Sequence, residues 1–498
     1  MESVWFATHP SSRSTDVFED GSHADTVVAG AGLTGLATAV LLARAGYQVV
    51  VLEARTVGAV TTGRTTGKLS LLQGLTLSGI LSHQSAEVAR AYVEGNREGQ
   101  AFLVRLMDDR GVPYERRRAV TYATTEDGLR KLRAEQEASR TAGLAAEWTD
   151  TTDLPFPVLG ALTLPDQVQL HPLRVLDMLQ AELIAHGGAV VEGVRVTAAD
   201  SSTPVQITTT AGRMTADRVV LATGTPILDR GAYFAKLIPH RSYATTFRVP
   251  GSPASIPQGM YLSADQPTRS LRTVAVDGDE LLMVGGNGHL TGRSSDTSGA
   301  VADLEAWTQE HFPGAERVHA WSAQDYRSVN RVPFVGLMPR GGGHIYVATG
   351  YDKWGMTNAI AAALHLAEEI LGGSMPWADT LRHRVTRPAA VMSAVSANAS
   401  VAVEATKDWM QAEMGSLPDA APAEGAGAVG RGHHGLPEGV STVDGVTCRV
   451  SAVCTHAGGV LGWNDAEKSW DCPLHGSRFA ADGTILEGPA VADLKRHD

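Results

Sequence analysis

The chain has 498 residues, of which 43% are apolar and 19% charged, and its formal net charge is −12. This balance gives no electrostatic reason to bind nucleic acid or anionic lipid, because both favour clustered Lys and Arg. The length exceeds what one core supports, and a prior of about 150 residues per domain predicts roughly three domains.

The N-terminal segment, residues 1–21, lacks a basic stretch followed by an apolar core, so we expect no secretory signal. No later segment offers roughly 18 consecutive apolar residues, so we expect no membrane span and a cytoplasmic location. The three cysteines provide no disulfide framework, which agrees with a reducing compartment.

The first organised segment is DTVVAGAGLTGLATAVLLARAGYQVVVLEAR, residues 25–55, which predicts a strand, a glycine turn, a helix and a second strand. In such a dinucleotide-binding unit the first glycine allows the tight turn, the second admits a pyrophosphate and the third lets helix and strand pack closely. The phosphate lies at the helix N-terminus, and the acid after the second strand accepts hydrogen bonds from ribose hydroxyls. The predicted cofactor contacts are Gly30, Gly32, Leu33, Thr34, Gly35, Glu53, Ala54 and Arg55.

Two later segments, 216–224 (ADRVVLATG) and 344–373, each begin with an apolar strand that ends in a small-residue turn. The second continues into an amphipathic helix. Taken singly, each also suits a buried strand of any α/β protein. In this order behind residues 25–55, they resemble the three dispersed cofactor segments of flavoproteins related to D-amino acid oxidase, glycine oxidase and sarcosine oxidase.

The resemblance covers roughly residues 23–375 and implies FAD, with the last helix directing its N-terminus at the flavin pyrimidine. A helix N-terminus stabilises negative charge that develops there. The resemblance assigns further cofactor contacts to Val196, Ala222, Thr223, Gly224, Gly350, Gly355, Met356 and Thr357.

Two stretches of another character lie at roughly 85–165 and 230–320. The second contains SYATTFRV and TVAVDGDELLMVGG, whose β-forming alternation, punctuated in this stretch by Gly and Pro, predicts an antiparallel sheet. The resemblance implies an α+β substrate domain inserted into a Rossmann-like α/β cofactor domain.

Three motifs narrow the resemblance to the subgroup of these oxidases that carries a Rieske domain: GRTTGKLSLLQG (63–74), QLHPLRVL (169–176) and WSAQDYRSVNRVPFVG (321–336). In that subgroup a threonine-rich loop lies along the pyrophosphate and flavin. Thr62, Thr65, Thr66 and Lys68 match it, although an ordinary polar loop is the alternative for each side chain. The subgroup has an acidic residue before the proline where this chain has Asn330, so Asn330 is given no role.

Two Cys-His pairs stand near the end of the chain: Cys454-Thr-His456, then 15 residues, then Cys472-Pro-Leu-His475. A Rieske 2Fe-2S centre uses two thiolates on one iron and two imidazoles on the other. Mononuclear zinc with the same ligands is the alternative, although zinc fingers more often pair like ligands.

The Rieske resemblance extends to the surroundings of these pairs. Ser477 matches a serine that hydrogen-bonds a bridging sulfide. Gly459 and Leu474 stand where high-potential Rieske proteins carry a disulfide, so a lower-potential cluster is expected. Cys448 is predicted to be a packed or free thiol.

The join between the two halves is predicted from composition. Residues 378–415 suit a helical connection, and residues 415–435 are rich in Gly, Ala and Pro, which predicts a flexible or surface-hugging tether. His433 and His434 are predicted to face solvent. The expected division is FAD-binding parts at 1–84, 166–229 and 321–376, substrate-domain parts at 85–165 and 230–320, a helical connection and linker at 377–435, and a small all-β Rieske domain at 436–498.

The expected function follows from the two cofactors. No second GxGxxG unit occurs, and GGNGHLTG at 285–292 has the wrong spacing, so the sequence offers no NAD(P)H site and electrons are expected to enter from an organic substrate. By resemblance this is an amine or amino acid whose C–N bond is oxidised by hydride transfer to FAD. The cluster then carries single electrons to an external acceptor, or FAD passes them to oxygen.

The sequence selects no catalytic side chain. The pocket candidates are Tyr351, Lys353, Trp354, His240, Arg241 and Tyr243. A cysteinyl flavin is excluded because the flavin domain has no Cys. Two alternatives stay open: a reductive or oxygenation-supporting flavoenzyme fed by the Rieske centre, and a non-catalytic redox carrier or sensor.

Overall fold

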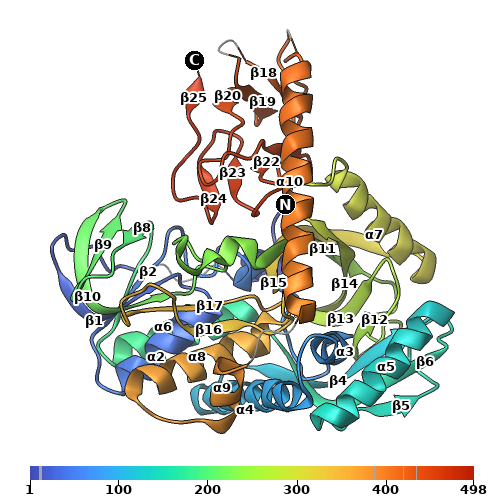
Figure 1. Cartoon of the computed structure of the whole chain (residues 1–498). Helices are drawn as coiled ribbons and strands as arrows, with labels where there is room; N and C mark the ends of the chain where they lie inside the picture. The colour runs from blue at the N-terminus through green and yellow to red at the C-terminus, as the bar shows by residue number, and fades with distance from the viewer. Residues whose placement is uncertain (10–13, 385–387, 419, 433–434, 498) are drawn as a thin grey trace.

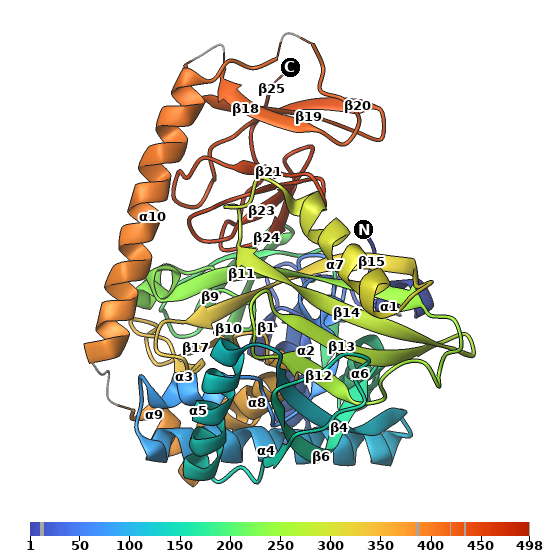
Figure 2. The ribbon, with the colours of Figure 1, turned by 90° about the vertical axis from the view of Figure 1, so that its right-hand side faces the viewer.

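The structure, a computed structural model, describes residues 1–9, 14–384, 388–418, 420–432 and 435–497. His433 and His434 lie outside these residues. A wide lower body carries a smaller C-terminal domain on its upper side, and a long helix runs along one flank of both (Figure 1, Figure 2). Within the described residues, no helix is both long and apolar enough to cross a bilayer.

The cofactor sheet has the strand order β16-β17-β10-β1-β2-β7, with β9 also paired to β10 and β8 to β9. The inner strands pair in parallel and are almost wholly buried, which explains their unbroken Val-rich sequences. Its strands are β1 His23–Ala29, β2 Val49–Leu52, β7 Ala189–Val191, β8 Val196–Ala199, β9 Val205–Thr209, β10 Gly212–Leu221, β16 Phe334–Leu337 and β17 Ile345–Thr349.

Helix α2 packs against α6 and α8 beside this sheet, and α8 also contacts α4. The Rossmann-like arrangement predicted from the sequence is therefore confirmed. The helices of the body are α1 Val4–Thr8, α2 Leu33–Arg44, α3 Thr76–Leu81, α4 Ala86–Arg110, α5 Glu126–Ala142, α6 Pro172–Ala185, α7 Thr297–His311, α8 Gly355–Leu371 and α9 Pro376–Arg382, with short 3-10 turns η1 Thr62–Arg64 and η2 Arg230–Ala235.

The second sheet of the body is mainly antiparallel, in the order β15-β11-β14-β13-β12-β4-β6-β3, with β5 paired to β6. Strands β6 and β15 run past the domain boundaries expected at 165 and 320, because β6 stays paired with β4 and β3, and β15 with β11, beyond those residues. The strands are β3 Lys68–Leu69, β4 Tyr114–Ala123, β5 Glu147–Thr149, β6 Gly160–Leu170, β11 Leu237–Arg248, β12 Met260–Ser263, β13 Arg269–Val276, β14 Asp279–Leu290 and β15 Glu316–Ser328.

The C-terminal domain is all-β, as expected. Two small antiparallel sheets, β18-β19-β20-β25 and β21-β22-β23-β24, enclose a core centred on Trp470 and Phe479. In both views β24 is the part of this domain nearest the body. The strands are β18 Gly427–Arg431, β19 Pro437–Val443, β20 Val446–Ser451, β21 Gly462–Asn464, β22 Ser469–Asp471, β23 Arg478–Ala480, β24 Ile485–Glu487 and β25 Arg496–His497.

The connection between the halves differs in part from the expectation. Helix α10, Pro388–Met414, is the predicted helical segment, and its Val401 and Ala405 pack on the C-terminal core. The prediction of a tether over 415–435 was wrong for β18, which is a paired edge strand. A Cβ at Gly427 would approach Trp463 to 2.4 Å, so glycine here serves close packing, a use that composition does not distinguish from flexibility.

Candidate functional site

A cavity of about 690 Å³ lies between the two sheets of the body. Most of the predicted cofactor residues line it: Gly30, Gly32, Leu33, Thr34, Glu53, Ala54, Arg55, Thr62, Thr65, Thr66, Lys68, Val196, Ala222, Thr223, Gly224, Gly355 and Met356. These residues come from segments far apart in the chain, so the fold brings them to one place. Gly35, Gly350 and Thr357 do not line the cavity.

The glycines of the first turn serve close approach of the backbone. Gly30 has φ +106°, and a Cβ there would lie 2.6 Å from the Ala222 carbonyl oxygen. At Gly35 a Cβ would lie 1.9 Å from the Gly30 carbonyl oxygen, so this glycine sets the distance between α2 and β1. Gly35 therefore supports the cofactor site from behind.

We expect Gly35→Ala to push α2 away from the turn, at an overpacking cost of about 1–3 kcal/mol. FAD affinity then falls by about tenfold or more, since each 1.4 kcal/mol is a factor of ten. Fluorescence titration of the apoprotein with FAD measures this. The control is Gly373→Ala, where a Cβ would meet Glu368 alone, its Cγ at 3.3 Å and its backbone oxygen at 3.7 Å, both longer than the contacts at Gly35. Equal FAD affinities in the two variants would contradict the prediction.

Glu53 lies at the end of β2, as the dinucleotide pattern predicts. Its two carboxylate oxygens accept the backbone N–H groups of Ala31 (2.8 Å) and Arg55 (2.9 Å). Burial raises its pKa, while these N–H groups act in the opposite direction. The carboxylate is thus held in a fixed orientation beside the cavity, and its contact with a ribose remains a prediction.

Lys68 is the first residue of β3, where the threonine-rich loop ends. Its side chain is buried, with the amino group against β12 and β13 of the second sheet of the body. It donates to the Tyr261 carbonyl (2.9 Å) and the Ser270 hydroxyl (2.6 Å). Burial, with the nearby Arg272, lowers its pKa to about 7. In the same loop, the Thr62 hydroxyl accepts the N–H of Leu33 at the start of α2 (3.2 Å).

The N-terminus of α8 rests on a buried polar network. The Gln73 amide donates to the Thr357 hydroxyl (2.9 Å) and accepts from Tyr92 (2.6 Å), while Asn358 donates to Tyr92 (2.9 Å). Thr357 thus holds the turn in place behind the cavity wall. Nothing in the sequence pattern singles out Gln73 or Tyr92.

Five of the six pocket candidates line the cavity: Tyr351, Lys353, Trp354, His240 and Tyr243. The prediction for Arg241 was wrong. Arg241 is fully buried on the opposite face of β11, where it donates to Ser322 and to Gln324 (3.4 Å). Side chains alternate between the faces of a strand, so Arg241 and Tyr243 share one face of β11, whereas His240 and Ser242 share the other. Tyr243 contributes to the cavity wall from that face, with its hydroxyl hydrogen-bonded to His289 (3.0 Å).

Among the charged residues of the cavity that the sequence analysis missed, Asp325 and Arg327 both lie on β15. Asp325 accepts the backbone N–H groups of Tyr326 (2.7 Å) and Lys353, and burial raises its pKa to about 7. The guanidinium of Arg327 makes no hydrogen bond or close ion pair with any described residue, although the charge of Asp352 acts on it. The i, i+2 spacing within WSAQDYRS is the signal that would have placed both on one face.

Strands β11 and β15 form a wall with two functional faces. The inner face lines the cavity with His240, Ser242, Ala323, Asp325 and Arg327. The outer face carries the C-terminal domain: at Gly476 a Cβ would meet Pro239 at 2.6 Å and Gln324 at 3.0 Å. One layer of backbone therefore separates the cavity from the second Cys-His loop.

The four predicted cluster ligands converge from two loops of the C-terminal domain. Each loop is closed by its cysteine N–H, from Cys454 to the Gly459 carbonyl and from Cys472 to the Ser477 carbonyl, both 2.8 Å. The imidazole rings of His456 and His475 are 5.1 Å apart. The thiols are in contact, and the hydrogen bond from Cys472 is the leading cause that lowers the pKa of Cys454 to about 6.

These residues fit a Rieske cluster. The Nδ1 atoms of His456 and His475 are buried without a hydrogen-bond partner among the described residues, as expected of atoms that bind a metal. Burial lowers the pKa of His475 to about 4, which keeps the imidazole in the neutral form that coordinates. Leu474 fills the space beside Gly459, where a Cβ would meet it at 2.6 Å. Ser477 is buried and accepts the Ala490 N–H (3.0 Å).

Residues of the body contact the two histidines of these loops. The Phe234 ring lies 5.9 Å from the ring of His456 and 5.2 Å from that of His475. The Asp229 carboxylate lies 3.1 Å from Nε2 of His456. The cluster ligands thus face the flavin-binding half of the chain.

Buried charges also join the two halves. Arg478 of β23 pairs with Asp471 (3.0 Å) and Glu487 (2.9 Å), and Arg241 of the body lies 3.8 and 3.9 Å from the same two acids. Next to them, Leu486, Glu487 and Gly488 line the FAD cavity. The C-terminal domain therefore completes the cavity wall, which no sequence motif indicated.

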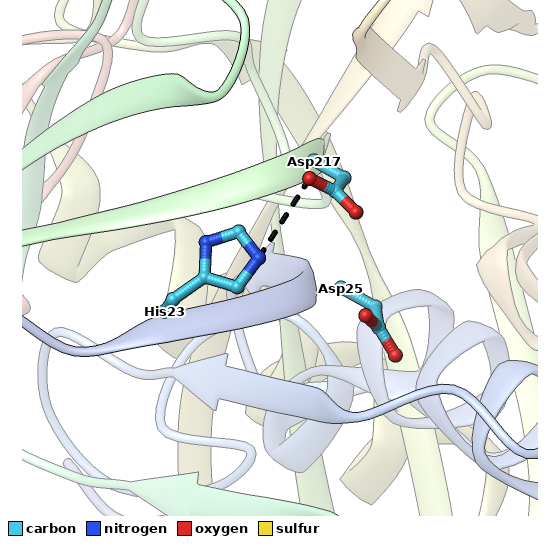
Figure 3. Close-up of side chains that lie close together, drawn as sticks. All are labelled: His23, Asp25 and Asp217. Atoms are coloured by element: carbon cyan, nitrogen blue, oxygen red, sulfur yellow. Dashed lines mark ion pairs between the residues drawn. The ribbon is translucent and has the colours of Figure 1, made fainter.

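Another group of potential metal ligands is His23, Asp25 and Asp217, shown in Figure 3, with ligand atoms within 4.8 Å of one another. His23 and Asp217 are exposed and 3.7 Å apart. Asp25 already accepts the Gln48 N–H (2.7 Å) and His23 bonds Thr215 (2.9 Å). With these contacts on a solvent-facing edge, we assign no metal to the group.

Comparison with known proteins agrees with this geometry. Residues 25–369 match the family described as FAD dependent oxidoreductase (DAO), and residues 438–498 match the Rieske [2Fe-2S] domain. The chain is 29% identical over 486 residues to the Rieske 2Fe-2S iron-sulfur protein YhfW of Bacillus subtilis (strain 168), covering 96% of this chain and 94% of that protein.

Two solved structures share the fold of the body. Glycine oxidase from Geobacillus kaustophilus is 20% identical with a TM-score of 0.60, covering 71% of this chain and 96% of that one. L-proline dehydrogenase from P. horikoshii is 16% identical with a TM-score of 0.61, covering 73% and 97%.

Proposed function

Because the chain belongs to the DAO family of FAD-dependent oxidoreductases and ends in a Rieske 2Fe-2S domain, we propose that it oxidises the C–N bond of an amino acid and passes the electrons singly through the cluster. Bound FAD supplies two-electron acceptance, and a 2Fe-2S cluster carries one electron at a time. The chain's own residues bind the substrate, move its proton and connect the two cofactor sites.

The observation that carries the proposal is a charged group on the cavity wall. Arg327, Arg331 and Lys353 supply three positive charges there, against the two carboxylates of Asp325 and Asp352. Arg331 lies 3.7 Å from Asp352, whereas the guanidinium of Arg327, which feels the charge of the same Asp352, makes no hydrogen bond or close ion pair with any described residue. A guanidinium fork of this kind matches a carboxylate, which favours an amino acid over a simple amine.

Asp325 suits the proton transfer that such a substrate needs. An ammonium group must lose a proton before the adjacent carbon can release hydride, and Asp325 is a carboxylate of the same cavity wall. With its pKa raised to about 7 by burial, it is ionised above neutrality and basic enough to accept that proton. His240, its partner across the strand pair, has a pKa lowered to about 3 and stays neutral.

The test is anaerobic mixing of the holoprotein with single amino acids and with their decarboxylated amines. Loss of the oxidised flavin absorbance, followed by the rhombic EPR signal of a reduced Rieske cluster, supports the proposal. If no amino acid or amine reduces the flavin, but an external donor reduces it through the cluster, electrons flow from the cluster to the flavin and the proposal is wrong.

We expect Arg327→Gln to raise KM for an amino acid by about 10- to 100-fold, because charge-assisted hydrogen bonds contribute about 1.5–3 kcal/mol. Steady-state kinetics measure this, and a substrate without a carboxylate should show no such change. The matched control is Arg317→Gln on the same strand, whose side chain is 40% exposed and pairs with Glu305 (2.8 Å). A KM that rises equally in both variants, or equally for both substrates, would argue against carboxylate binding by Arg327.

A further inference from the structure

Gln324 touches both cofactor sites. On the body side, its backbone carbonyl accepts the hydroxyl of Thr61 (2.7 Å), and Thr61 lines the FAD cavity. On the other side, its amide nitrogen donates to the Gly476 carbonyl (2.7 Å). Gly476 follows the cluster ligand His475 directly, so few bonds separate the cavity from the ligand loop.

The amide of Gln324 is held in one orientation. Its nitrogen also donates to the Tyr326 hydroxyl (2.8 Å), and its oxygen accepts from Arg241 (3.4 Å). Gln324 itself is 1% exposed, and Gly476 has φ +81°, a conformation that favours glycine. The contact is therefore built into the buried wall between the sites and does not depend on a mobile surface loop.

We propose that Gln324 is the positioning residue of a fixed electron path that runs from the flavin cavity through Thr61, Gln324 and Gly476 to the His475 side of the cluster. The proposal rests on the proposed function for the direction of flow. It adds that transfer needs no movement of the Rieske domain, because the ligand loop is already bonded to the cavity wall.

An external acceptor takes up the electrons that leave the substrate. A substrate that loses a hydride delivers two electrons, and the ferric cluster takes one of them at a time. Each passes to a one-electron acceptor, for which ferricyanide serves in the assay, so two equivalents are consumed for each C–N bond oxidised. The substrate is oxidised to the imine, and two protons are released to solvent for each turnover: the one that travelled with the hydride and the one from the substrate nitrogen.

The other contact between the ligand loops and the body is less suited to this role. Asp229 reaches His456, but its side chain is 70% exposed and it does not line the cavity. Phe234 touches both imidazoles yet is likewise absent from the cavity wall. Among these contacts, the path through Gln324 alone joins a cavity-lining side chain to a ligand loop by hydrogen bonds.

The test reduces the flavin by light, so that no amine is needed, and follows the arrival of electrons at the cluster by freeze-quench EPR. Gln324→Leu is expected to slow this transfer on the order of tenfold or more, as loss of an outer-shell partner does. The cluster's midpoint potential, from an EPR-monitored redox titration, and the flavin spectrum should not change. The matched control is Gln84→Leu, another buried glutamine whose amide donates to a backbone carbonyl, that of Asn330 (3.1 Å).

A second variant covers the case in which Gln324→Leu loses its cluster. Thr61→Val breaks the same path at the cavity end, by removing a hydroxyl that touches no residue of the Rieske domain. It too should slow transfer while the cluster signal stays intact. Wild-type rates in both variants would overturn the proposal. Absence of any light-driven transfer in the wild type would overturn the whole circuit, whereas transfer by light without reduction by amines would fault only the proposed substrate.

Discussion

Cys472→Ser is expected to remove the iron–sulfur centre while FAD stays bound. Cys472 is 2% exposed, the thiol in contact with it belongs to the other predicted ligand Cys454, and the remaining cysteine, Cys448, lies outside both ligand loops, so no spare thiol is placed to substitute for it. Serine does not replace a thiolate on iron, since Rieske clusters need both cysteines. The iron content and the EPR signal of the reduced protein should both fall to background, whereas the flavin absorbance should be retained.

The chain offers a matched control in Cys448→Ser. Cys448 is a free, half-buried thiol in β20, outside both ligand loops. This variant should keep the iron and the EPR signal of the wild type. Iron retained in Cys472→Ser would show that the ligand assignment is wrong. With the cluster gone, amino acids should still reduce the flavin, and the reduction of ferricyanide should slow.

Asp325→Asn is expected to lower kcat/KM for an amino acid by about 10²- to 10⁴-fold, the usual contribution of a positioned acid or base. The charged groups that face Asp325 are Asp352 and Lys353 from the turn before α8, with the neutral His240 across the strand pair. Because the pKa of Asp325 is about 7, wild-type kcat/KM should rise with pH through neutrality. In the variant that rise should be absent.

The same carboxyl has an effect on stability with a defined sign. Its pKa is about 7 in the folded protein against an ordinary 3.8, so between these values the native state holds a proton that the unfolded chain has released. The free energy of unfolding therefore decreases as pH rises through this window. Between about pH 4 and pH 8, the Tm measured by thermal unfolding should decrease less with rising pH in Asp325→Asn than in the wild type.

Two measurements separate the chemical role of Asp325 from a structural one. Asparagine retains one acceptor oxygen, so it satisfies only one of the two N–H groups, from Tyr326 and Lys353, that Asp325 now binds. FAD affinity and Tm report that disturbance, whereas the pH profile reports the lost proton acceptor. Asp277→Asn, in the turn between β13 and β14 with φ +50°, is the control. A pH profile unchanged in Asp325→Asn would remove Asp325 from the reaction.

The fold and both cofactors could be predicted from the sequence because local constraints determine them. Gly30 and Gly35 are required by backbone contacts that any side chain would block, and Cys454, His456, Cys472 and His475 are the predicted ligands, whose spacing matches that of a Rieske centre. Within each motif the required residues stand only a few positions apart, so their spacing is visible in the sequence even where the contact itself, as from Gly30 to Ala222, is with a distant residue. The match of residues 25–369 and 438–498 to the two families confirms that reading.

The substrate end of the cavity could not be predicted, because its residues become neighbours only through long-range pairing. Arg327 and Lys353 belong to a strand and a distant turn, and Gly488 comes from the other domain. Arg241 was placed in the pocket although β11 turns it the other way; choosing the face requires the pairing with β15, which no local pattern supplies. The strand β18 was missed because its glycines serve packing.

The buried charges between the halves mean that the Rieske domain is not a detachable module. A truncated chain ending before β19 would leave Arg241, which is fully buried, without Asp471 and Glu487 nearby. It would also lack Leu486, Glu487 and Gly488, leaving the FAD cavity open on that side. Removal of the domain would therefore require compensating changes in the oxidoreductase half, at Arg241 and along the open side of the cavity.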